Sequence, residues 1–336
     1  MIKGCFLCKK GGRFPYVFGQ GRMDRIRKRI QVCDEIICQE NLEANRDFLK
    51  DVEVAFSTWD TPEFTKEEIQ EYFPNLKVLF YGAASVWYFA RPFMECGVRI
   101  LSSWKIMAVP VAQFTVSLIT LANKGALLTL DLYKEKGYSV ARELPDKIYP
   151  GSYQTKVGIL GVGAIGSLVI KMLKGSGMEV MVYDLFLSEE RERELGVTRT
   201  SLEEIFSQCQ TISNHIANNP QTVGMLNYDL FSRMGDHASF INTGRGAQIV
   251  EPDLVRALKE KPGRSAYLDV TYPEPVAPDH EFLKMKNVFL FPHTAGYARD
   301  EVLMFSDFMI RQLDHYLAGE PFDSYEVTEP MLATMA

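Results

Sequence analysis

Residues 156–184, KVGILGVGAIGSLVIKMLKGSGMEVMVYD, constrain the fold of this 336-residue chain more than any other segment. Residues 157–160 form a short apolar run that predicts one buried strand, and three glycines follow within the next six residues. Residues 167–174 are typical of a helix, and residues 179–183 predict a second strand that ends at Asp184. Strand, glycine turn, helix, strand and acid, in that order, are typical of a parallel βαβ unit.

Each glycine of this turn has a task that a larger side chain would block. Gly161 permits the tight turn, Gly163 lets a pyrophosphate approach the backbone, and Gly166 lets helix and strand pack closely. The start of the helix offers free N–H groups and a positive dipole end to phosphates. Asp184 can accept both hydroxyls of an adenosine ribose and would repel a 2′-phosphate, and neither of the next two residues is an Arg. The segment therefore predicts NAD binding, in preference to NADP; the alternative is a plain βαβ packing turn.

Composition and charge limit the remaining possibilities. The chain is 46% apolar and 24% charged, which is ordinary for a globular protein and leaves room for two domains. A net charge of −6 gives no electrostatic footprint for nucleic acid or an anionic membrane. No apolar run reaches the about 18 residues that a spanning helix needs, so we expect no membrane segment, and the N-terminus lacks a signal-peptide apolar core. We expect a cytoplasmic protein with neither a nucleic-acid nor a membrane partner.

The six cysteines do not have the pattern of a disulfide framework in a chain of this length. Cys5 and Cys8 form a CxxC pair, but no second pair has metal-ligand spacing. We favour cysteines of an amino-terminal strand over a redox or zinc site, and we predict no metal site.

The first part of the chain, residues 1–103, alternates short apolar runs with amphipathic stretches, which predicts a small parallel sheet with helices on both faces. Thr65 and Glu68 fit a capping box, and Pro74 would stop the helix that they begin. The expected strands are residues 52–56, 78–81 and 98–101, and the expected helices are residues 65–73 and 86–95.

The small residues 82–85 follow one of these strands, at the edge where parallel sheets dock ligands. Their exposed N–H groups could hold a ligand, or they could form an ordinary turn between strand and helix. Further on, residues 109–135 predict one long helix with Pro110 near its start and Gly137 after its end. This helix is apolar on nearly every side, so we interpret it as a bridge between domains and a dimer contact. A helix buried wholly within one subunit is the alternative.

Beyond Asp184 the chain predicts further strands whose carboxyl ends form the crevice of a doubly wound sheet. They lie within residues 198–215, 240–243, 266–270 and 288–291, and residues 301–317 predict a last helix that Gly319 ends. The polar groups that these strands deliver to the crevice are Asn214, His215, Asn242, Thr243, Gly244, Arg245, Asp269, Glu274 and His293.

Three of these groups suit hydride transfer between a nicotinamide and a carbonyl. The planar guanidinium of Arg245 can bind a carboxylate twice. His293 can exchange a proton, because imidazole titrates near neutrality, and Glu274 could orient that ring and favour its protonated form. Taken singly, the three could be a surface cation, a structural histidine and a loop acid.

The other histidines give weaker signals. His215 could be a wall residue or a contact in the cofactor crevice, whereas His237, His280 and His315 are expected at the surface because their neighbours are polar.

Four sequence blocks resemble the D-isomer-specific 2-hydroxyacid dehydrogenases, the family of phosphoglycerate dehydrogenase and glyoxylate/hydroxypyruvate reductase. They are INTGRGAQIVEPDLVRAL (241–258), YLDVTYPEP (267–275), NVFLFPHTAG (287–296) and SNHIANNPQTVGMLN (213–227). The resemblance implies an α/β protein with a Rossmann NAD-binding domain at residues 104–296. It also implies a smaller, flavodoxin-like substrate domain at residues 1–103 and 297–336, and a homodimer formed through the NAD domain.

The resemblance also implies roles for individual residues. Arg245 would bind the substrate, Glu274 would support the histidine, and His293 would be the acid/base in the reaction between a 2-oxo acid and a D-2-hydroxy acid. The N–H groups of Ala83 and Ala84 would hold the substrate carboxylate. The predicted cofactor contacts are Gly161, Gly163, Ala164, Ile165, Gly166, Asp184, Ile216, Thr222, Thr243, Gly244, Asp269 and Gly296.

The chain departs from the family pattern at three positions, in the first domain and in the helix that follows it. Gln113 stands where the family often has an acid, Trp87 where it has Asp, and Ala108 where it often has Thr. Trp87, Trp104 and Lys105 are candidates to line an unusual pocket, so no particular acid is predicted. Two alternatives remain: an NAD-sensing regulator like the corepressors that share this fold, and an enzyme that oxidises formate or phosphite.

Overall fold

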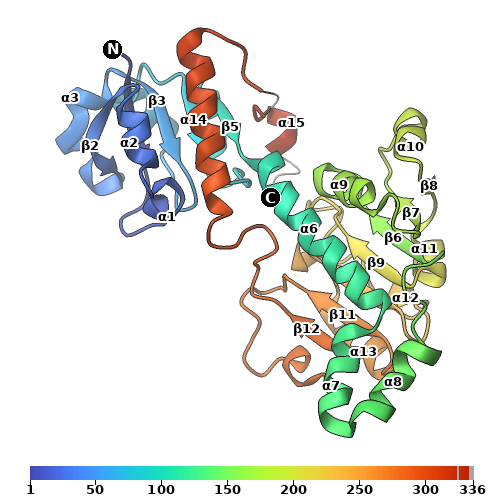
Figure 1. The fold of residues 1–336 in the computed structure, drawn as a ribbon. Coiled ribbons are helices and arrows are strands. Elements are labelled where there is room, and N and C mark those ends of the chain that lie inside the picture. Colours follow the sequence, from blue (N-terminus) through green and yellow to red (C-terminus); the bar gives the residue numbers. More distant parts are fainter. Residues whose placement is uncertain (324, 333–336) are drawn as a thin grey trace. The chain divides into compact units, whose positions relative to one another are not determined.

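The computed structural model describes residues 1–323 and 325–332, and the chain divides into two compact units (Figure 1). Unit 1 is Met1–Met107 with Tyr297–Ala336, and unit 2 is Ala108–Gly296. The boundary falls inside helix α6 (Trp104–Asn123), not before it as expected from the sequence. Ile106 and Met107, at the start of that helix, still pack against the core of unit 1.

Unit 1 is a five-stranded parallel sheet in the order β2-β1-β3-β4-β5, the flavodoxin-like order. Its helices form two hydrophobic cores with the sheet, one with α3 to α5 and the other with α1, α2 and α14. The strands are β1 (Lys3–Leu7), β2 (Gln31–Ile37), β3 (Val52–Ser57), β4 (Val78–Tyr81) and β5 (Arg99–Ser102). The helices are α1 (Phe14–Phe18), α2 (Arg22–Arg27), α3 (Arg46–Leu49), α4 (Lys66–Tyr72), α5 (Ala90–Glu95), α14 (Val302–Ala318) and α15 (Glu329–Leu332).

Local sequence signals in unit 1 are largely confirmed. Thr65 caps α4 through a complete capping box with Glu68, and Gly319 ends α14 in a left-handed conformation. The helix predicted for residues 86–95 is half wrong, because its first residues form a turn and α5 begins only at Ala90. Cys5 lies in β1 and Cys8 directly follows it, both buried as free thiols, and burial raises the pKa of each.

Unit 2 is a seven-stranded parallel sheet in the order β12-β11-β10-β9-β6-β7-β8. The strand order reverses between β6 and β9, so the crevice of this Rossmann-type sheet opens between those strands. The strands are β6 (Lys156–Leu160), β7 (Glu179–Tyr183), β8 (Thr198–Arg199), β9 (Thr211–Asn214), β10 (Ser239–Asn242), β11 (Ser265–Leu268) and β12 (Val288–Leu290). The helices beyond α6 are α7 (Ala126–Lys136), α8 (Tyr138–Lys147), α9 (Ala164–Leu173), α10 (Glu189–Leu195), α11 (Leu202–Gln208), α12 (Tyr228–Phe231) and α13 (Glu251–Glu260).

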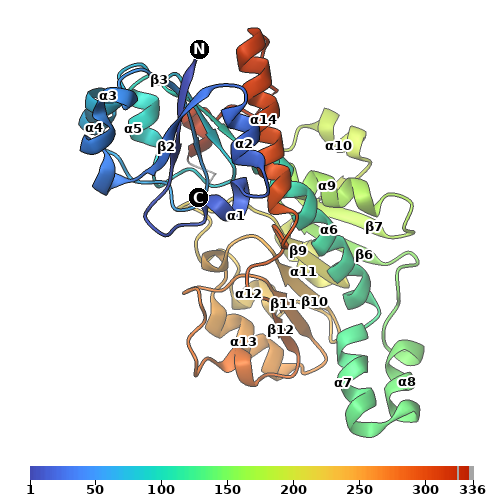
Figure 2. The same ribbon diagram turned by 60° about the vertical axis from the view of Figure 1, so that its left-hand side comes forward.

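The single helix predicted for residues 109–135 is wrong, because the chain breaks it into α6 and α7 at Gly125. That glycine has a φ of 56°, and a Cβ there would lie 2.1 Å from the ring of Tyr149. After α7 the chain reverses at Gly137, which has a φ of 81°, and Figures 1 and 2 both show α7 and α8 side by side.

Among the described residues, α6 is the one helix long and apolar enough to cross a membrane, with a mean hydropathy of 1.6. The expectation that no stretch reaches that length therefore does not hold for α6. Half of its apolar window is buried in the structure, and Leu118, Ile119 and Ala122 pack into the core of unit 2. The core helix of a globular protein can have the same length and composition.

Candidate active site

The glycine turn after β6 has the geometry that a dinucleotide requires. Gly161 has a φ of 87°, and a Cβ there would lie 2.6 Å from the carbonyl oxygen of His215, because the chains after β6 and β9 meet here. A Cβ on Gly166 would lie 2.0 Å from the oxygen of Gly161. Gly163 is different, since nothing described lies within 4 Å of where its Cβ would stand. This open space above the start of α9 fits a pyrophosphate, so the residues present suit a dinucleotide cofactor.

Asp184 follows β7 and lies at the same edge of the sheet. Its Oδ2 accepts from the N–H of Val162 at 2.7 Å, and its Oδ1 accepts from the N–H of Phe186 at 2.8 Å. Each carboxylate oxygen keeps a lone pair for a ribose hydroxyl. Leu185 and Phe186 are exposed and carry no charge that would offset the repulsion of a 2′-phosphate.

The loop after β9 forms the other wall of the crevice. The N–H of Ile216 donates to Oδ1 of Asn214 at 3.2 Å, which fixes the start of the loop. The hydroxyl of Thr222 donates to the oxygen of Ala217 at 2.8 Å and accepts from the N–H of Asn219 at 3.0 Å. The structure therefore uses Thr222, a predicted cofactor contact, to hold the loop in shape.

His215 lies in this wall as a neutral imidazole. Its Nε2 lies 2.9 Å from the hydroxyl of Ser213, and its buried Nδ1 meets no partner in the described part of the chain. Burial lowers the pKa of His215 to about 3, because the charged ring would lose its hydration.

Arg245 follows β10 and is half-buried at the carboxyl edge of the sheet. Its Nη1 donates to the oxygen of Gly244 at 2.9 Å; no other described residue takes a hydrogen bond from its side chain. Burial lowers the pKa of Arg245, while the nearby carboxylate of Glu274 acts in the opposite direction. The guanidinium thus keeps donors for a ligand and lies within electrostatic reach of Glu274.

The structure brings Glu274 and His293 together. The Nδ1–H of His293 donates to Oε1 of Glu274 at 2.5 Å, and both side chains are partly exposed. The backbone of His293 has a φ of 54°, a region that residues other than glycine rarely adopt. Such strain persists only where neighbouring contacts enforce it.

Asp269 supplies those contacts from the end of β11. Its Oδ1 accepts from the N–H of Thr294 at 2.9 Å, and its Oδ2 accepts from the N–H of Ala295 at 3.0 Å. Its carbonyl oxygen accepts from the N–H of His293 itself at 3.0 Å. Asp269 was predicted as a cofactor contact, and the structure adds that it holds the turn that carries the imidazole.

Glu251 holds the loop of Glu274 and was not predicted from the sequence. Its Oε1 accepts from the N–H of Tyr272 at 2.8 Å, and its Oε2 lies 3.2 Å from Nε2 of His280. Burial raises the pKa of Glu251, although Tyr272 and His280 act to lower it. The expectation of a surface position for His280 is wrong, because this pairing buries most of its ring. An acid at the start of a helix gives no sequence signal for such a long-range contact.

The remaining predicted cofactor contacts follow the same elements. Ala164 and Ile165 form the first turn of α9, and Gly296 is the last residue of unit 2. The hydroxyl of Thr243 lies 3.1 Å from that of Thr115, and the N–H of Gly244 donates to Oδ1 of Asn242 at 3.0 Å.

In unit 1, Ala83 and Ala84 lie after β4 with their carbonyl groups held. The hydroxyl of Ser102 donates to both carbonyl oxygens, at 2.8 and 2.7 Å. No residue that the structure describes accepts from the N–H of Ala83 or Ala84, and Ala83 itself has no exposed surface.

The three residues predicted to line the pocket of this unit differ in their surroundings. Trp87 follows the same loop and is 60% exposed. Trp104 and Lys105 pack beside Tyr325, with the ammonium of Lys105 about 5 Å from both rings.

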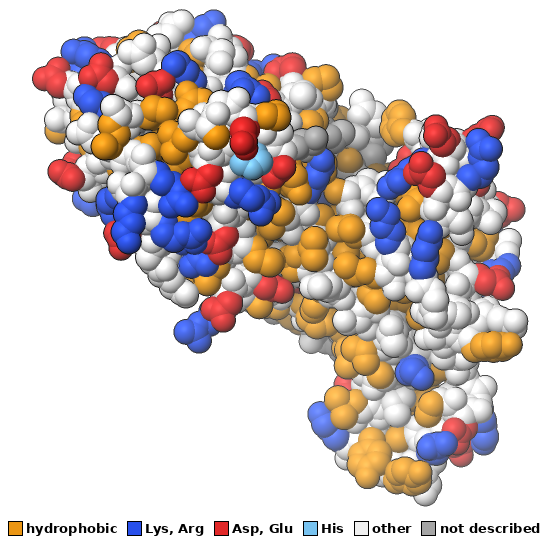
Figure 3. Space-filling view, turned by 45° about the horizontal axis from the view of Figure 1, so that its top comes forward, with side chains coloured by type: hydrophobic (Ala, Val, Ile, Leu, Met, Phe, Trp, Pro, Cys, Tyr) orange, Lys and Arg blue, Asp and Glu red, His pale blue; other side chains and the backbone are white. Residues whose placement is uncertain are grey.

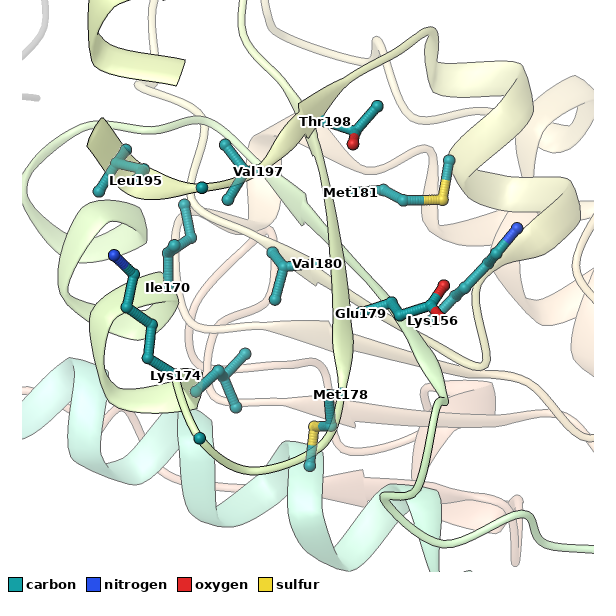
Figure 4. A pocket seen from close by; sticks show the side chains of 13 residues that line it. Lys156, Ile170, Lys174, Met178, Glu179, Val180, Met181, Leu195, Val197 and Thr198 are labelled. Carbon is teal, nitrogen blue, oxygen red and sulfur yellow. The ribbon is translucent and has the colours of Figure 1, made fainter. Parts of the chain in front are cut away.

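A cavity of about 590 Å³ lies elsewhere in unit 2, lined by Lys156, Glu179, Leu195 and Thr198 among others (Figure 4). Lys156 and Glu179 are the first residues of β6 and β7, so this cavity lies at the amino edge of the sheet. The glycine turn, Asp184 and Arg245 lie at the carboxyl edge. The cavity is therefore separate from the candidate site.

Comparison with known proteins supports the assignment that this geometry suggests. Residues 120–295 match the family described as D-isomer specific 2-hydroxyacid dehydrogenase, NAD binding domain. The chain belongs to this family. Unit 2 is therefore the NAD-binding domain of a D-isomer-specific 2-hydroxyacid dehydrogenase family member, and NAD is its cofactor.

Among relatives in the family, the glyoxylate reductase of Korarchaeum cryptofilum is 30% identical over 225 residues, 67% of this chain and 68% of that enzyme. The human glyoxylate reductase/hydroxypyruvate reductase is 29% identical, over 74% of this chain and 76% of that enzyme. The hydroxypyruvate reductase of Blautia hydrogenotrophica is 33% identical, but the match spans about half of its length, 51%.

Solved structures show the same fold over nearly the whole chain. Apo D-mandelate dehydrogenase of Rhodotorula graminis has a TM-score of 0.80 at 22% identity, with 98% of each chain covered. A phosphoglycerate oxidoreductase from Rhizobium etli also has a TM-score of 0.80, at 18% identity, covering 98% of this chain and 99% of that one. At these identities the likeness is one of fold alone, and it agrees with the two parallel sheets of the family.

Proposed function

We propose that the chain interconverts a 2-oxo acid and a D-2-hydroxy acid, using NAD(H) as the hydride carrier. The observation that carries this proposal is the hydrogen-bonded pair of His293 and Glu274, within electrostatic reach of Arg245, on an NAD-binding domain. When bound, the nicotinamide supplies or accepts the hydride, and the protein must bind the acid and move one proton.

Arg245 is the group that binds the substrate in unit 2. Its free guanidinium donors can take the carboxylate and the carbonyl oxygen of a 2-oxo acid. Because the side chain is half-buried, its charge is less screened by water and polarises the carbonyl more strongly.

His293 is the acid/base. During reduction the protonated imidazole gives its Nε2 proton to the carbonyl oxygen as hydride reaches the carbon, and in oxidation it takes that proton back. Its other nitrogen stays bonded to Glu274, which fixes the ring orientation and stabilises the imidazolium. Asp269 keeps the backbone of His293 in its strained conformation, so the imidazole stays in place between turnovers.

The relatives' names indicate which acids to test first. Glyoxylate and hydroxypyruvate reductases are among the relatives, so the panel is glyoxylate, hydroxypyruvate, pyruvate and branched-chain 2-oxo acids, and turnover is followed as loss of NADH absorbance. Formate and phosphite, offered with NAD, test the alternative chemistry. We expect turnover with at least one 2-oxo acid and its loss in His293→Ala, whereas His315→Gln, in unit 1, should keep it. If His293→Ala keeps most of the turnover, the assigned acid/base is wrong.

We also propose that unit 2 forms a homodimer through the hairpin of α7 and α8. No residue of α7 and only Ala141 of α8 is buried, so the hairpin has little core of its own. Leu130, Tyr133 and Tyr138 are each more than half exposed, and orange side chains gather on the lobe at the foot of Figure 3. An apolar surface of this kind on a second copy would cover it in a symmetric contact.

Light scattering during gel filtration tests this arrangement. Tyr133→Glu should convert the dimer to a monomer, and Tyr16→Glu, at an exposed tyrosine of unit 1, should leave it dimeric. A wild-type monomer would overturn the proposal.

A further inference from the structure

Three buried amide side chains connect the strand ends of unit 2. Asn214 ends β9, Asn242 ends β10, and Gln248 lies in the short helix that follows Arg245, each with no exposed surface. The Nδ2 of Asn214 donates to Oδ1 of Asn242 at 3.1 Å and to Oε1 of Gln248 at 2.6 Å. The three side chains therefore form one connected network.

One end of this network holds the cofactor loop after β9. The Nε2 of Gln248 donates to the oxygen of Ile216 at 2.8 Å and to that of Ala217 at 3.1 Å. The Oδ1 of Asn214 accepts from the N–H of Ile216 at 3.2 Å. The backbone of Ile216 is thus held on both of its polar sides.

The other end holds the segment that carries Arg245. The Nδ2 of Asn242 donates to the carbonyl oxygen of Arg245 at 3.0 Å, and its Oδ1 accepts from the N–H of Gly244 at 3.0 Å. The backbone of Gly246 leaves this segment little room to move, because a Cβ there would lie 2.1 Å from the backbone of Thr271. The position of the Arg245 backbone is thus set by Asn242.

Each amide oxygen and nitrogen of the network has a hydrogen-bond partner. Moving three amides out of water nevertheless costs more free energy than burying apolar side chains of the same size. A fully bonded buried network has one favoured geometry, whereas apolar contacts tolerate sliding. The arrangement therefore favours accurate placement of the two loops over maximal stability.

We propose that Asn214, Asn242 and Gln248 are positioning residues that fix the cofactor loop and Arg245 as one unit, so that loosening the loop also displaces the guanidinium. This inference rests on the proposed function for the role of Arg245. A merely structural role would change stability alone. The proposed role instead links the dissociation constant for NADH to the KM for the 2-oxo acid.

Gln248→Met tests the link, because methionine fills a similar volume without the hydrogen bonds. We expect the dissociation constant for NADH, measured by cofactor fluorescence, to rise about tenfold, since two carbonyl groups lose their donors. We also expect KM for the best 2-oxo acid, measured at saturating NADH, to rise about fivefold, because Arg245 is no longer held in place. Asn242→Ala, at the other end, should raise the same KM.

Ser239→Ala is the matched control. Ser239 begins the strand that Asn242 ends, and its hydroxyl is buried 2.9 Å from that of Ser265, so the substitution removes an equivalent buried hydrogen bond away from the site. It should lower the melting temperature without changing either constant. Gln248→Glu, which keeps an acceptor for Asn214, replaces Gln248→Met if the latter does not fold.

The outcomes separate the network from the proposed function. If Gln248→Met lowers the melting temperature as Ser239→Ala does and leaves both constants within about twofold of wild type, the network is structural only and the inference fails. If NADH binding weakens but KM at saturating NADH is unchanged, the link to Arg245 fails. If the wild-type protein binds NADH and reduces no 2-oxo acid, the proposed function fails, and an unchanged NADH dissociation constant in Gln248→Met would still overturn the inference.

Discussion

Nδ1 of His293 lies 2.5 Å from Oε1 of Glu274, although 18 residues separate them along the chain. Three acids produce this pairing: Glu274 accepts from the ring, Asp269 holds the turn of His293, and Glu251 holds the loop of Glu274. The imidazole is therefore positioned from both sides, which is what proton transfer to a bound carbonyl requires.

The first prediction concerns Glu274→Gln, which keeps a hydrogen-bonding side chain and removes the charge. An amide no longer stabilises the imidazolium, so reduction should lose about 10- to 100-fold in kcat at neutral pH. Turnover at saturating NADH and 2-oxo acid measures the loss, and a kcat equal to that of wild type would count against the pairing.

The second prediction contrasts two glycines of one turn. Gly163→Ala adds a Cβ in open space at ordinary backbone angles, so the melting temperature should stay within a few degrees while NADH binding weakens by about 10-fold or more. Gly166→Ala places its Cβ against the oxygen of Gly161 and should destabilise the fold itself. Calorimetry and NADH titration separate the two effects. A Gly163→Ala protein that binds NADH normally would show that no phosphate approaches this turn.

Many strands and helices of this fold can be predicted from the sequence, because the signals for them come from neighbouring residues. The run 179–183 coincides with β7, and the capping box of Thr65 and Glu68 begins α4, because neighbouring residues decide both. The break at Gly125 was missed because a single glycine does not by itself end a helical pattern, and its left-handed φ and the ring of Tyr149 beside it are visible only in the structure. Strand β1 was expected only as an amino-terminal strand around Cys5 and Cys8, without bounds. Strand β2 was not placed, because its buried and exposed residues alternate only irregularly.

The same distinction holds for the candidate site. Arg245, Glu274 and His293 could be named because each belongs to a recognisable block after a strand. Asn214 and Asn242 could be placed at the crevice, but their network with Gln248 and the role of Glu251 could not be predicted, because amides and acids acquire such roles only through partners far away in the chain. Sequence therefore indicates which groups to propose for the reaction, and the structure shows which groups hold them.

The third prediction concerns the choice of cofactor. Asp184→Ser combined with Leu185→Arg removes the carboxylate and adds a cation, so the preference for NADH over NADPH should fall by about 100-fold or reverse. Because Asp184 also accepts from Val162 and Phe186, a moderate loss of stability should accompany the change. The ratio of kcat/KM for the two cofactors measures the effect, with Leu185→Arg alone as the control. An unchanged ratio would show that Asp184 does not meet the ribose.

The fourth prediction concerns stability in acid. Burial lowers the pKa of His215 to about 3, whereas an unfolded histidine titrates near 6.5, so between these values the unfolded chain binds a proton that the folded one excludes. The stabilisation from a neutral His215 is therefore complete above pH about 6.5 and is lost as pH falls toward 3. At pH 5 the loss should be about 1 to 2 kcal/mol. His215→Gln does not titrate and can still form a hydrogen bond with Ser213. Between pH 7 and pH 5 the urea midpoint of wild type should therefore fall more than that of His215→Gln, so that the variant approaches or passes wild type. Parallel curves for the two proteins over that range would mean that His215 takes up its proton in the folded state as readily as in the unfolded chain.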